Sequence, residues 1–141
     1  MSEKMKVQQD YPLSQKRPDL LKAPTGKMLE DITLEKVMKG EVDPEDVRIS
    51  PETLELQAQI ADADGRQAIS RNFRRAAELI AIPDERLLEI YNALRPYRST
   101  KQELVDIAEE LEEKYDAKIN GAFIREASEV YEKRNKLKKD E

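Results

Sequence analysis

Apolar residues recur every three or four positions along the chain after residue 50, which is the spacing of one buried face of an α-helix. We expect five such helices, beginning near residues 51, 66, 84, 101 and 121. No run of residues alternates between apolar and polar in the way that a half-buried strand does. The pattern therefore predicts an all-α fold, an irregular bundle of about five helices.

Local signals mark where some of these helices begin. Ser50 can accept a backbone hydrogen bond as an N-cap, and Pro51 suits the first helical position. Thr100 and Glu103 have the spacing of a capping box. Asn120 is expected to cap the last helix. These signals place three of the helix starts.

Four of the helices carry one apolar stripe each, which we expect to be buried in the bundle. The stripe members are Ile69, Phe73, Ala76, Ala77 and Ile80; Leu87, Leu88, Ile90, Tyr91 and Leu94; Leu104, Ile107, Ala108, Leu111 and Tyr115; and Phe123, Ile124, Ala127, Val130 and Tyr131. The opposite faces of these helices are largely charged, as expected of surfaces in water.

The helix that begins near residue 51 is apolar on two faces rather than one. One face carries Leu54, Ala58 and Ala61, and the nearly opposite face carries Leu56, Ile60 and Ala63. Such a helix needs a cover on both sides. The second cover can come from the same domain or from another protein, and we place Leu56 and Ile60 in an interface with a partner.

Residues 1–32 lack a helical period and contain three spaced prolines. Proline at such spacing interrupts helices and favours an extended path. One interpretation is a disordered tail, and the other is an arm that lies along a partner through apolar residues such as Tyr11 and Leu13. We predict an extended N-terminal arm over residues 1–32 and a helical domain over residues 33–141, with Tyr11 and Leu13 in the partner interface.

The composition limits what the chain does alone. Of its 141 residues, 38% are hydrophobic and 39% are charged, so one modest core is expected. The 30 acidic and 25 basic residues are interspersed, and a net charge of −5 does not favour nucleic acid as a partner. No apolar stretch is long enough to span a membrane, and the N-terminus lacks the apolar core of a signal peptide. We expect a cytoplasmic protein.

The chain has no histidine and no cysteine. This removes the commonest general base and metal ligand, and every nucleophile that depends on either residue. The four glycines are too widely separated for a nucleotide-binding loop. The carboxylates at residues 109–113 fit a solvated helix face better than a pair of catalytic acids. We therefore assign no catalytic, cofactor-binding or metal-binding residue to this chain.

Three arginines, Arg71, Arg74 and Arg75, gather on the polar face of the helix that begins near residue 66. They can be solvated charges paired with Glu78 and its neighbours, they can bind phosphate, or they can form ion pairs across a subunit interface. Aromatic residues for stacking on bases do not interleave with them, which argues against the phosphate grip. The first and third interpretations stay open, and we add the three arginines to the predicted partner interface.

Long runs of the sequence resemble a known protein family. They are Val47-Arg48-Ile49-Ser50-Pro51, Leu54 to Ala61, Arg71 to Leu87, Ile90 to Ser99, and Phe123-Ile124-Arg125-Glu126. The similarity extends from about residue 33 to the end of the chain. On these runs the chain resembles the small subunit of the adenosylcobalamin-dependent glycerol and diol dehydratases.

This resemblance implies a role inside a larger enzyme. In that family, large, medium and small subunits assemble as a dimer of heterotrimers, which converts glycerol to 3-hydroxypropanal and water. The resemblance places substrate, metal ion and adenosylcobalamin in the other two subunits, and it leaves the small subunit to dock on the large one and stabilise it. The short N-terminal arm favours the glycerol branch. The alternative is a free-standing helical adapter, or a nucleic-acid-binding bundle that uses the arginine face.

Overall fold

The computed structural model describes residues 4–139, in which the regular structure is helical apart from one isolated β-bridge. The prediction of an all-α fold is confirmed. The chain divides into two compact units, one up to Ala77 and one from Glu78 onward, and this division differs from the predicted one at residue 33. Residues 1–3 of the predicted arm and residues 140–141 of the predicted helical domain lie outside the described residues.

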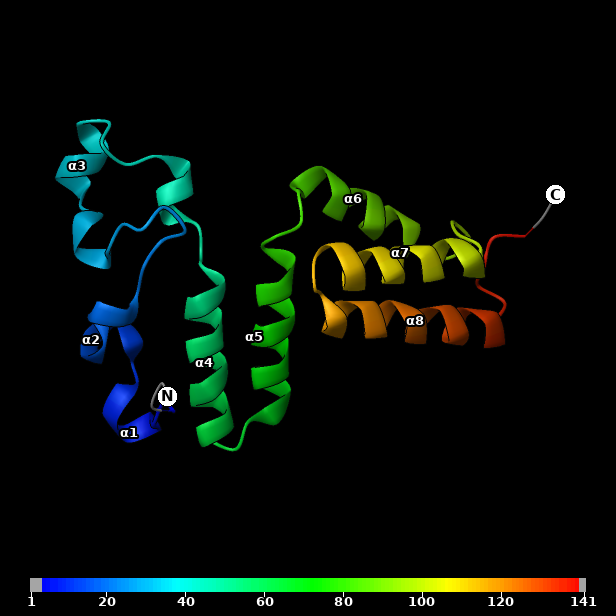
Figure 1. Ribbon diagram of the computed structural model, residues 1–141, viewed down its shortest axis with the longest axis horizontal. Coiled ribbons are helices and arrows are strands. Elements are labelled where there is room, and N and C mark those ends of the chain that lie inside the picture. The colour runs from blue at the N-terminus through cyan, green and yellow to red at the C-terminus, as the bar shows by residue number, and fades with distance from the viewer. Residues whose placement is uncertain (1–3, 140–141) are drawn as a thin grey trace. The chain divides into compact units, whose positions relative to one another are not determined.

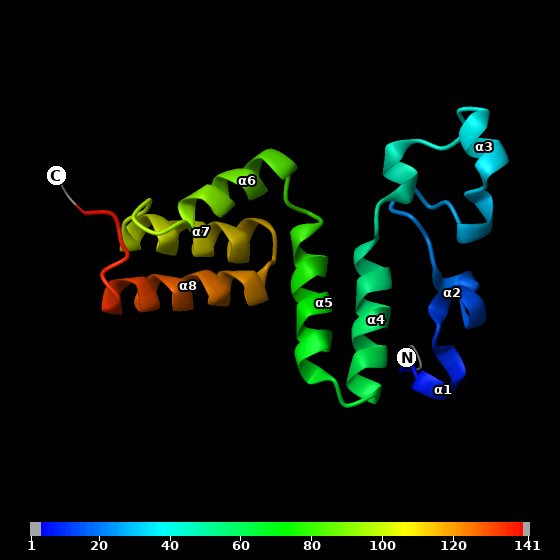
Figure 2. The same ribbon diagram turned by 180° about the vertical axis from the view of Figure 1, so that it is seen from behind.

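The first unit combines short helices from the N-terminal part of the chain with two long ones. The short helices are α1 (Val7–Asp10), α2 (Leu13–Lys16) and α3 (Leu34–Met38), and the long ones are α4 (Pro51–Ala63) and α5 (Gln67–Leu79), whose last residues belong to the second unit. Single 3-10 turns lie at Pro18–Leu20, Leu29–Asp31 and Pro44–Val47. Helices α4 and α5 run antiparallel side by side (Figure 1), and Figure 2 shows the same pair from behind.

Part of the N-terminal segment is wound into short helices, so the predicted extended path is wrong for residues 7–10, 13–16 and 18–20, while Tyr11 and Pro12 between them are extended. Its prolines do not prevent this winding. Pro12 lies at the N-cap of α2 and Pro18 opens a 3-10 turn, and neither position requires a backbone N–H. Proline spacing therefore indicated where helices start rather than where they are absent.

Helix α4 is apolar on two faces, as predicted; Leu54, Ala58 and Ala61 of the first face are buried, and the second face is covered at Ile60 but open at Ala63. Ile60 packs with Met5 and Leu13 of the N-terminal segment, and all three side chains are buried. Leu56 is half-buried against the same cluster. The second cover of α4 comes from the chain's own N-terminal segment, where we expected a partner.

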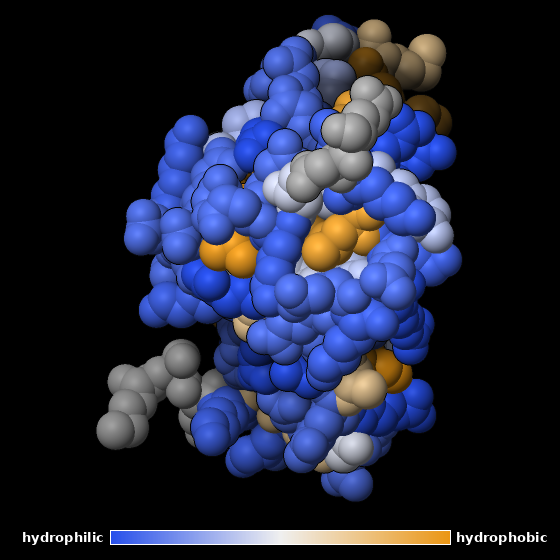
Figure 3. Space-filling model, turned by 90° about the vertical axis from the view of Figure 1, so that its right-hand side faces the viewer, coloured by the Kyte–Doolittle hydropathy of each residue, from blue (hydrophilic) through white to orange (hydrophobic). Residues whose placement is uncertain are grey.

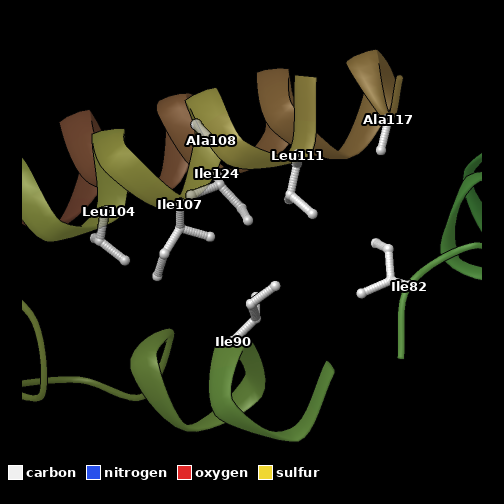
Figure 4. Close-up of a cluster of buried hydrophobic side chains, with 8 residues drawn as sticks. All are labelled: Ile82, Ile90, Leu104, Ile107, Ala108, Leu111, Ala117 and Ile124. Atoms are coloured by element: carbon white, nitrogen blue, oxygen red, sulfur yellow. The ribbon is translucent and has the colours of Figure 1, made fainter. Parts of the chain in front are cut away.

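The second unit consists of α6 (Asp84–Ala93), α7 (Lys101–Lys114) and α8 (Lys118–Lys133). Helices α7 and α8 pack along each other, and Ile90 of α6 points towards α7 (Figure 4). The core of the unit is formed by Ile82, Ile90, Leu104, Ile107, Ala108, Leu111, Ala117 and Ile124. Burial of the stripe predicted for α7 is confirmed for Leu104, Ile107, Ala108 and Leu111.

Two of the predicted helix starts are confirmed and one is wrong. The hydroxyl of Ser50 accepts the N–H of the third residue of α4 at 3.2 Å. Thr100 and Glu103 form the expected capping box of α7. Asn120 does not cap α8, because that helix begins before it and Asn120 lies buried in its first turn.

Parts of the predicted stripes lie open to solvent. On α6, Leu88 and Tyr91 are 66% and 79% exposed, although both were expected in the core. Phe123 on α8, Ile69 on α5 and Ile80, directly after the end of α5, are also exposed. Each of these helices has an apolar face wider than its neighbours cover, so part of each predicted stripe remains at the surface.

Candidate functional site

A groove of about 550 Å³ opens in the first unit between the N-terminal segment, α4 and α5. Tyr11 and Leu13 line it from the N-terminal segment, Ile60 lines it from α4, and Ile69 and Phe73 line it from α5. The structure thus brings three of the predicted interface residues, Tyr11, Leu13 and Ile60, around one apolar hollow.

Of these three residues, Tyr11 alone presents most of its surface to solvent, with 57% exposed. Leu13 and Ile60 are buried against each other, so a partner can contact them only by entering the groove. Leu56, the fourth predicted apolar contact, is half-buried. The contacts of Leu13, Leu56 and Ile60 hold the N-terminal segment on α4, and their predicted role in a partner interface stays a prediction.

Arg74 turns towards α4. Its Nε donates to Glu55 Oε2 at 3.1 Å, its Nη2 pairs with Asp62 Oδ2 at 2.9 Å, and its Nη1 donates to the hydroxyl of Ser70 at 2.9 Å. The bonds with Glu55 and then Asp62 raise the pKa of Arg74, and hydrogen bonds from Ser70 and then Arg74 lower the pKa of Asp62. Arg74 therefore ties α5 to α4.

The three arginines are not equivalent in the structure. Arg71 is exposed and has no ion pair within residues 4–139, whereas Arg75 is half-buried and Arg74 is bound to α4. The expected pairing of these arginines with Glu78 is replaced, for Arg74, by pairing with residues of α4. Contact of any of the three with a partner stays a prediction.

Glu78 has a role that the sequence did not indicate. Its Oε1 accepts the N–H of Ile119 at 2.9 Å, and its Oε2 accepts the N–H of Asn120 at 2.9 Å and the side-chain amide of Asn120 at 2.7 Å. These N–H groups lie in the first turn of α8, where no carbonyl of the helix can reach them. Glu78 therefore caps α8 from 41 residues away and places a negative charge at the positive end of the helix dipole.

A more open hollow of about 520 Å³ lies on the second unit between α6 and α7. Arg86 lines it and is bound there by Glu110 and, at 2.7 Å, by Glu89. These bonds raise the pKa of Arg86, and the guanidinium in turn lowers the pKa of Glu110. The pairing of Arg86 with Glu110 and Glu89 is typical of a structural ion pair. Arg98, Glu103 and Asp106 line the same hollow and form no ion pair among residues 4–139.

Five described carboxyl groups with a displaced pKa favour the ionised form. Within residues 4–139, every carboxyl group with a displaced pKa has it lowered by hydrogen bonds and cations, and these groups are Asp10, Asp46, Asp62, Glu110 and Glu112. A carboxylic acid that donates a proton near neutral pH needs a raised pKa instead. These groups act as ionised acceptors that hold the fold.

The described part of the chain also contains no group of three or more acidic side chains placed to hold a metal ion. None of the helices between residues 4 and 139 has both the length and the apolar character needed to cross a lipid bilayer.

Two pairs of large apolar side chains stand open to solvent at helical spacing. Leu34 and Met38 on α3 are 77% and 81% exposed, and Leu88 and Tyr91 on α6 are 66% and 79% exposed. Residues three or four apart share one face of a helix. Single exposed apolar residues are ordinary, but paired ones on one face are typical of an interaction surface. We call Leu88 and Tyr91 the α6 surface.

A signal for the α6 surface was present in the sequence. On a helical projection, Leu87, Ile90 and Leu94 point in one direction, while Leu88 and Tyr91 lie about 60–120° away from it. A stripe of that width is more than one neighbouring helix covers. The width of the stripe, rather than its presence, indicated the exposed surface.

Comparison with known proteins found close similarity over most of the chain. Residues 6–138 match the family model described as dehydratase small subunit. The chain is 58% identical to the propanediol dehydratase small subunit of Citrobacter freundii over 132 residues, covering 94% of this chain and 77% of that protein. It is also 58% identical to the propanediol dehydratase small subunit of Salmonella typhimurium strain LT2, covering 94% of this chain and 76% of that protein.

Proposed function

This chain belongs to the dehydratase small-subunit family, and we propose that it is the non-catalytic small subunit of a diol dehydratase. The proposed enzyme is a hydro-lyase that removes water from glycerol or propanediol. We propose that the chain works in the cytoplasm, in a dimer of heterotrimers with a large and a medium subunit. Its task there is to dock on the catalytic large subunit and stabilise it.

The docking role is supported above all by the α6 surface. Complete burial of a leucine or aromatic side chain contributes about 1.5–3 kcal/mol, and most of that gain is still unrealised at Leu88 and Tyr91. Tyrosine is also enriched among the residues that dominate binding energy at the centre of interfaces. A partner with an apolar pocket therefore gains substantially by covering these two side chains.

The non-catalytic part of the proposal is supported by the chemistry that the chain offers. It has no histidine or cysteine, and the displaced pKa values of its carboxyl groups point to ion pairing rather than acid catalysis. We therefore propose that the reaction depends on residues of the other subunits.

Adenosylcobalamin does not fit this chain. Without histidine the chain has no imidazole to offer a transition metal, and its hollows of about 520 and 550 Å³ are of the size that encloses a drug-sized ligand. We therefore propose that the other subunits bind the cofactor and that this chain contributes no group to it.

The choice between glycerol and propanediol is a finer part of the proposal. The two relatives are named for propanediol, and we propose that the assembled enzyme accepts both diols. Turnover of the purified complex with each diol in turn measures this directly.

The test of the docking role is co-purification with the large and medium subunits from the same source. We expect the isolated small subunit to show no turnover and the three-subunit complex to be active. Leu88→Asp with Tyr91→Asp should weaken retention of the small subunit by at least about a hundredfold, because an interface would then bury two unpaired charges. Asn92→Asp, on the same helix and also exposed, adds a charge without removing an apolar group and should have little effect.

Retention of the double variant at wild-type strength would remove the α6 surface from the interface. Failure of the wild-type chain to bind the other subunits at all would contradict the proposed function itself. Ile60→Asp is unsuitable as a test, because Ile60 is packed against Met5 and Leu13 and a charge there would disrupt the first unit.

A further inference from the structure

Residues 136–138 are held against the loop between α6 and α7. Tyr97 donates its N–H to the carbonyl of Lys136 at 2.7 Å, and Lys138 donates its N–H to the carbonyl of Ser99 at 2.8 Å. Leu137, between the two lysines, packs against the core of the second unit. Two segments nearly forty residues apart in the sequence therefore form one surface.

Lys136 and Tyr97 reinforce this attachment. The Nζ atom of Lys136 donates to the Tyr97 hydroxyl at 3.0 Å and lies 5.1 Å from the centre of the ring. The hydrogen bond and the charge of Lys136 lower the pKa of Tyr97. One face of this ring is thus occupied by a cation of the chain itself.

The joined segments concentrate positive charge. Their exposed cations are Arg95, Arg98, Lys133, Arg134, Lys138 and Lys139, which we call the basic cluster. None of the six forms an ion pair within the part of the chain that the structure describes. Glu132 is bound to Lys101, while Arg98 shares a hollow of the second unit with Glu103, Asp106 and Glu110. Most of the face on this side of the molecule is hydrophilic (Figure 3).

Helix dipoles account for only part of the basic cluster. Cations are favoured in the last turn of a helix, where Lys133 lies at the end of α8. Arg98, Lys138 and Lys139 lie beyond the last turns of both α6 and α8, and the effect of the dipole fades within that distance. Six cations that form no ion pair among residues 4–139 favour an anionic neighbour.

We propose that the basic cluster docks on an acidic surface of a neighbouring subunit in the assembled enzyme. The inference rests on the proposed function and extends the same interface. Arg95 follows Tyr91 by four residues, so the basic cluster adjoins the α6 surface and forms a charged rim beside an apolar centre. This is the usual arrangement of a protein interface. The partner surface is an apolar pocket bordered by aspartate and glutamate side chains.

A nucleic acid fits these observations less well than an acidic protein surface. The whole chain is negatively charged, and Lys136 already occupies one face of the Tyr97 ring, which leaves only the other face for stacking on a base. Exposed Leu88 and Tyr91 next to the cations favour a partner with apolar side chains.

The experiment measures binding of the full-length small subunit to the complex of large and medium subunits over a range of salt concentrations. The test variant carries Arg95→Gln, Arg98→Gln and Lys139→Gln. The control carries Lys4→Gln, Lys6→Gln and Lys22→Gln, which removes the same charge from exposed lysines of the first unit. Duplex DNA serves as a second probe of the wild-type chain.

An exposed ion pair strengthens binding by roughly 1.4- to 5-fold, so loss of three should raise the dissociation constant at least about threefold near 0.15 M salt. The difference should vanish near 1 M salt, where the Debye length is about 3 Å. The control should bind as the wild type does.

Equal binding by the test variant and the wild type at low salt would overturn the inference while leaving the proposed function intact. An equal loss in the control would also overturn it, because net charge alone would then explain the effect. Tight binding of DNA that the test variant loses would identify a nucleic-acid surface instead. If the triple variant has a lower melting temperature than the wild type, the double variant Arg95→Gln with Lys139→Gln is measured in its place. Absence of any binding by the wild-type chain would overturn both proposals.

Discussion

Gly121 of α8 lies against Glu112 of α7, and its replacement by alanine is a direct test of the packing of the two helices. A Cβ atom on Gly121 would lie 2.5 Å from Cγ, 2.8 Å from Oε1 and 3.0 Å from Cδ of Glu112. The Glu112 side chain is held in this position by Arg125, whose Nε and Nη2 donate to its two carboxylate oxygens at 3.0 and 2.9 Å. The clash cannot be relieved without moving that ion pair.

Two effects of opposite sign decide the stability of Gly121→Ala. Alanine favours a helix over glycine by about 1 kcal/mol. Overpacking of a tight contact costs about 1–3 kcal/mol, and displacement of Glu112 from Arg125 adds to the cost. We expect a net loss of about 1–2 kcal/mol in the free energy of unfolding.

The same substitution should change sign when Glu112 is shortened. In a Glu112→Ala background the three contacts disappear, and Gly121→Ala should stabilise the protein by about 1 kcal/mol through helix propensity alone. Urea unfolding followed by circular dichroism at 222 nm suits a chain without tryptophan. Stabilisation by Gly121→Ala to the same extent in both backgrounds would refute the close approach of α7 and α8.

Two further predictions concern polar contacts that join distant parts of the chain. Glu78→Ala should lower the stability of the second unit by about 2 kcal/mol, measured by urea unfolding, because α8 loses its cap, while the exposed Glu129→Ala should change it little. Hydrogen bonds from Thr25, Lys27 and the N–H of Asp43 hold the pKa of Asp46 at about 2, below its usual 3.8. Because the folded-state pKa of Asp46 is depressed, its contribution to stability is complete above about pH 4 and is lost as the pH falls towards 2. Acid titration of the unfolding free energy should show this loss. The Asp46→Asn variant should not show it, because its amide does not titrate.

The structure shows where a local apolar pattern is not enough to assign a residue to a core or to an interface. Leu13 and Ile60 were recognised as apolar residues in need of a cover, and they cover each other. Leu88 and Tyr91 were assigned to the core because their spacing is helical, yet spacing does not say how wide a face the neighbouring helices bury.

The sequence alone determined the class of the fold, the five long helices, and the caps at Ser50 and Thr100, because each depends on residues within one or two turns of one another. It also determined the family, through long runs of similar residues.

The tertiary structure alone decided which segment covers the second face of α4 and that Glu78 caps α8. It also decided that the loop carrying Arg95 and Arg98 lies against the segment carrying Lys138 and Lys139. These features bring together residues tens of positions apart. Their pairing is selected by the packing of the folded chain, and no local pattern records it.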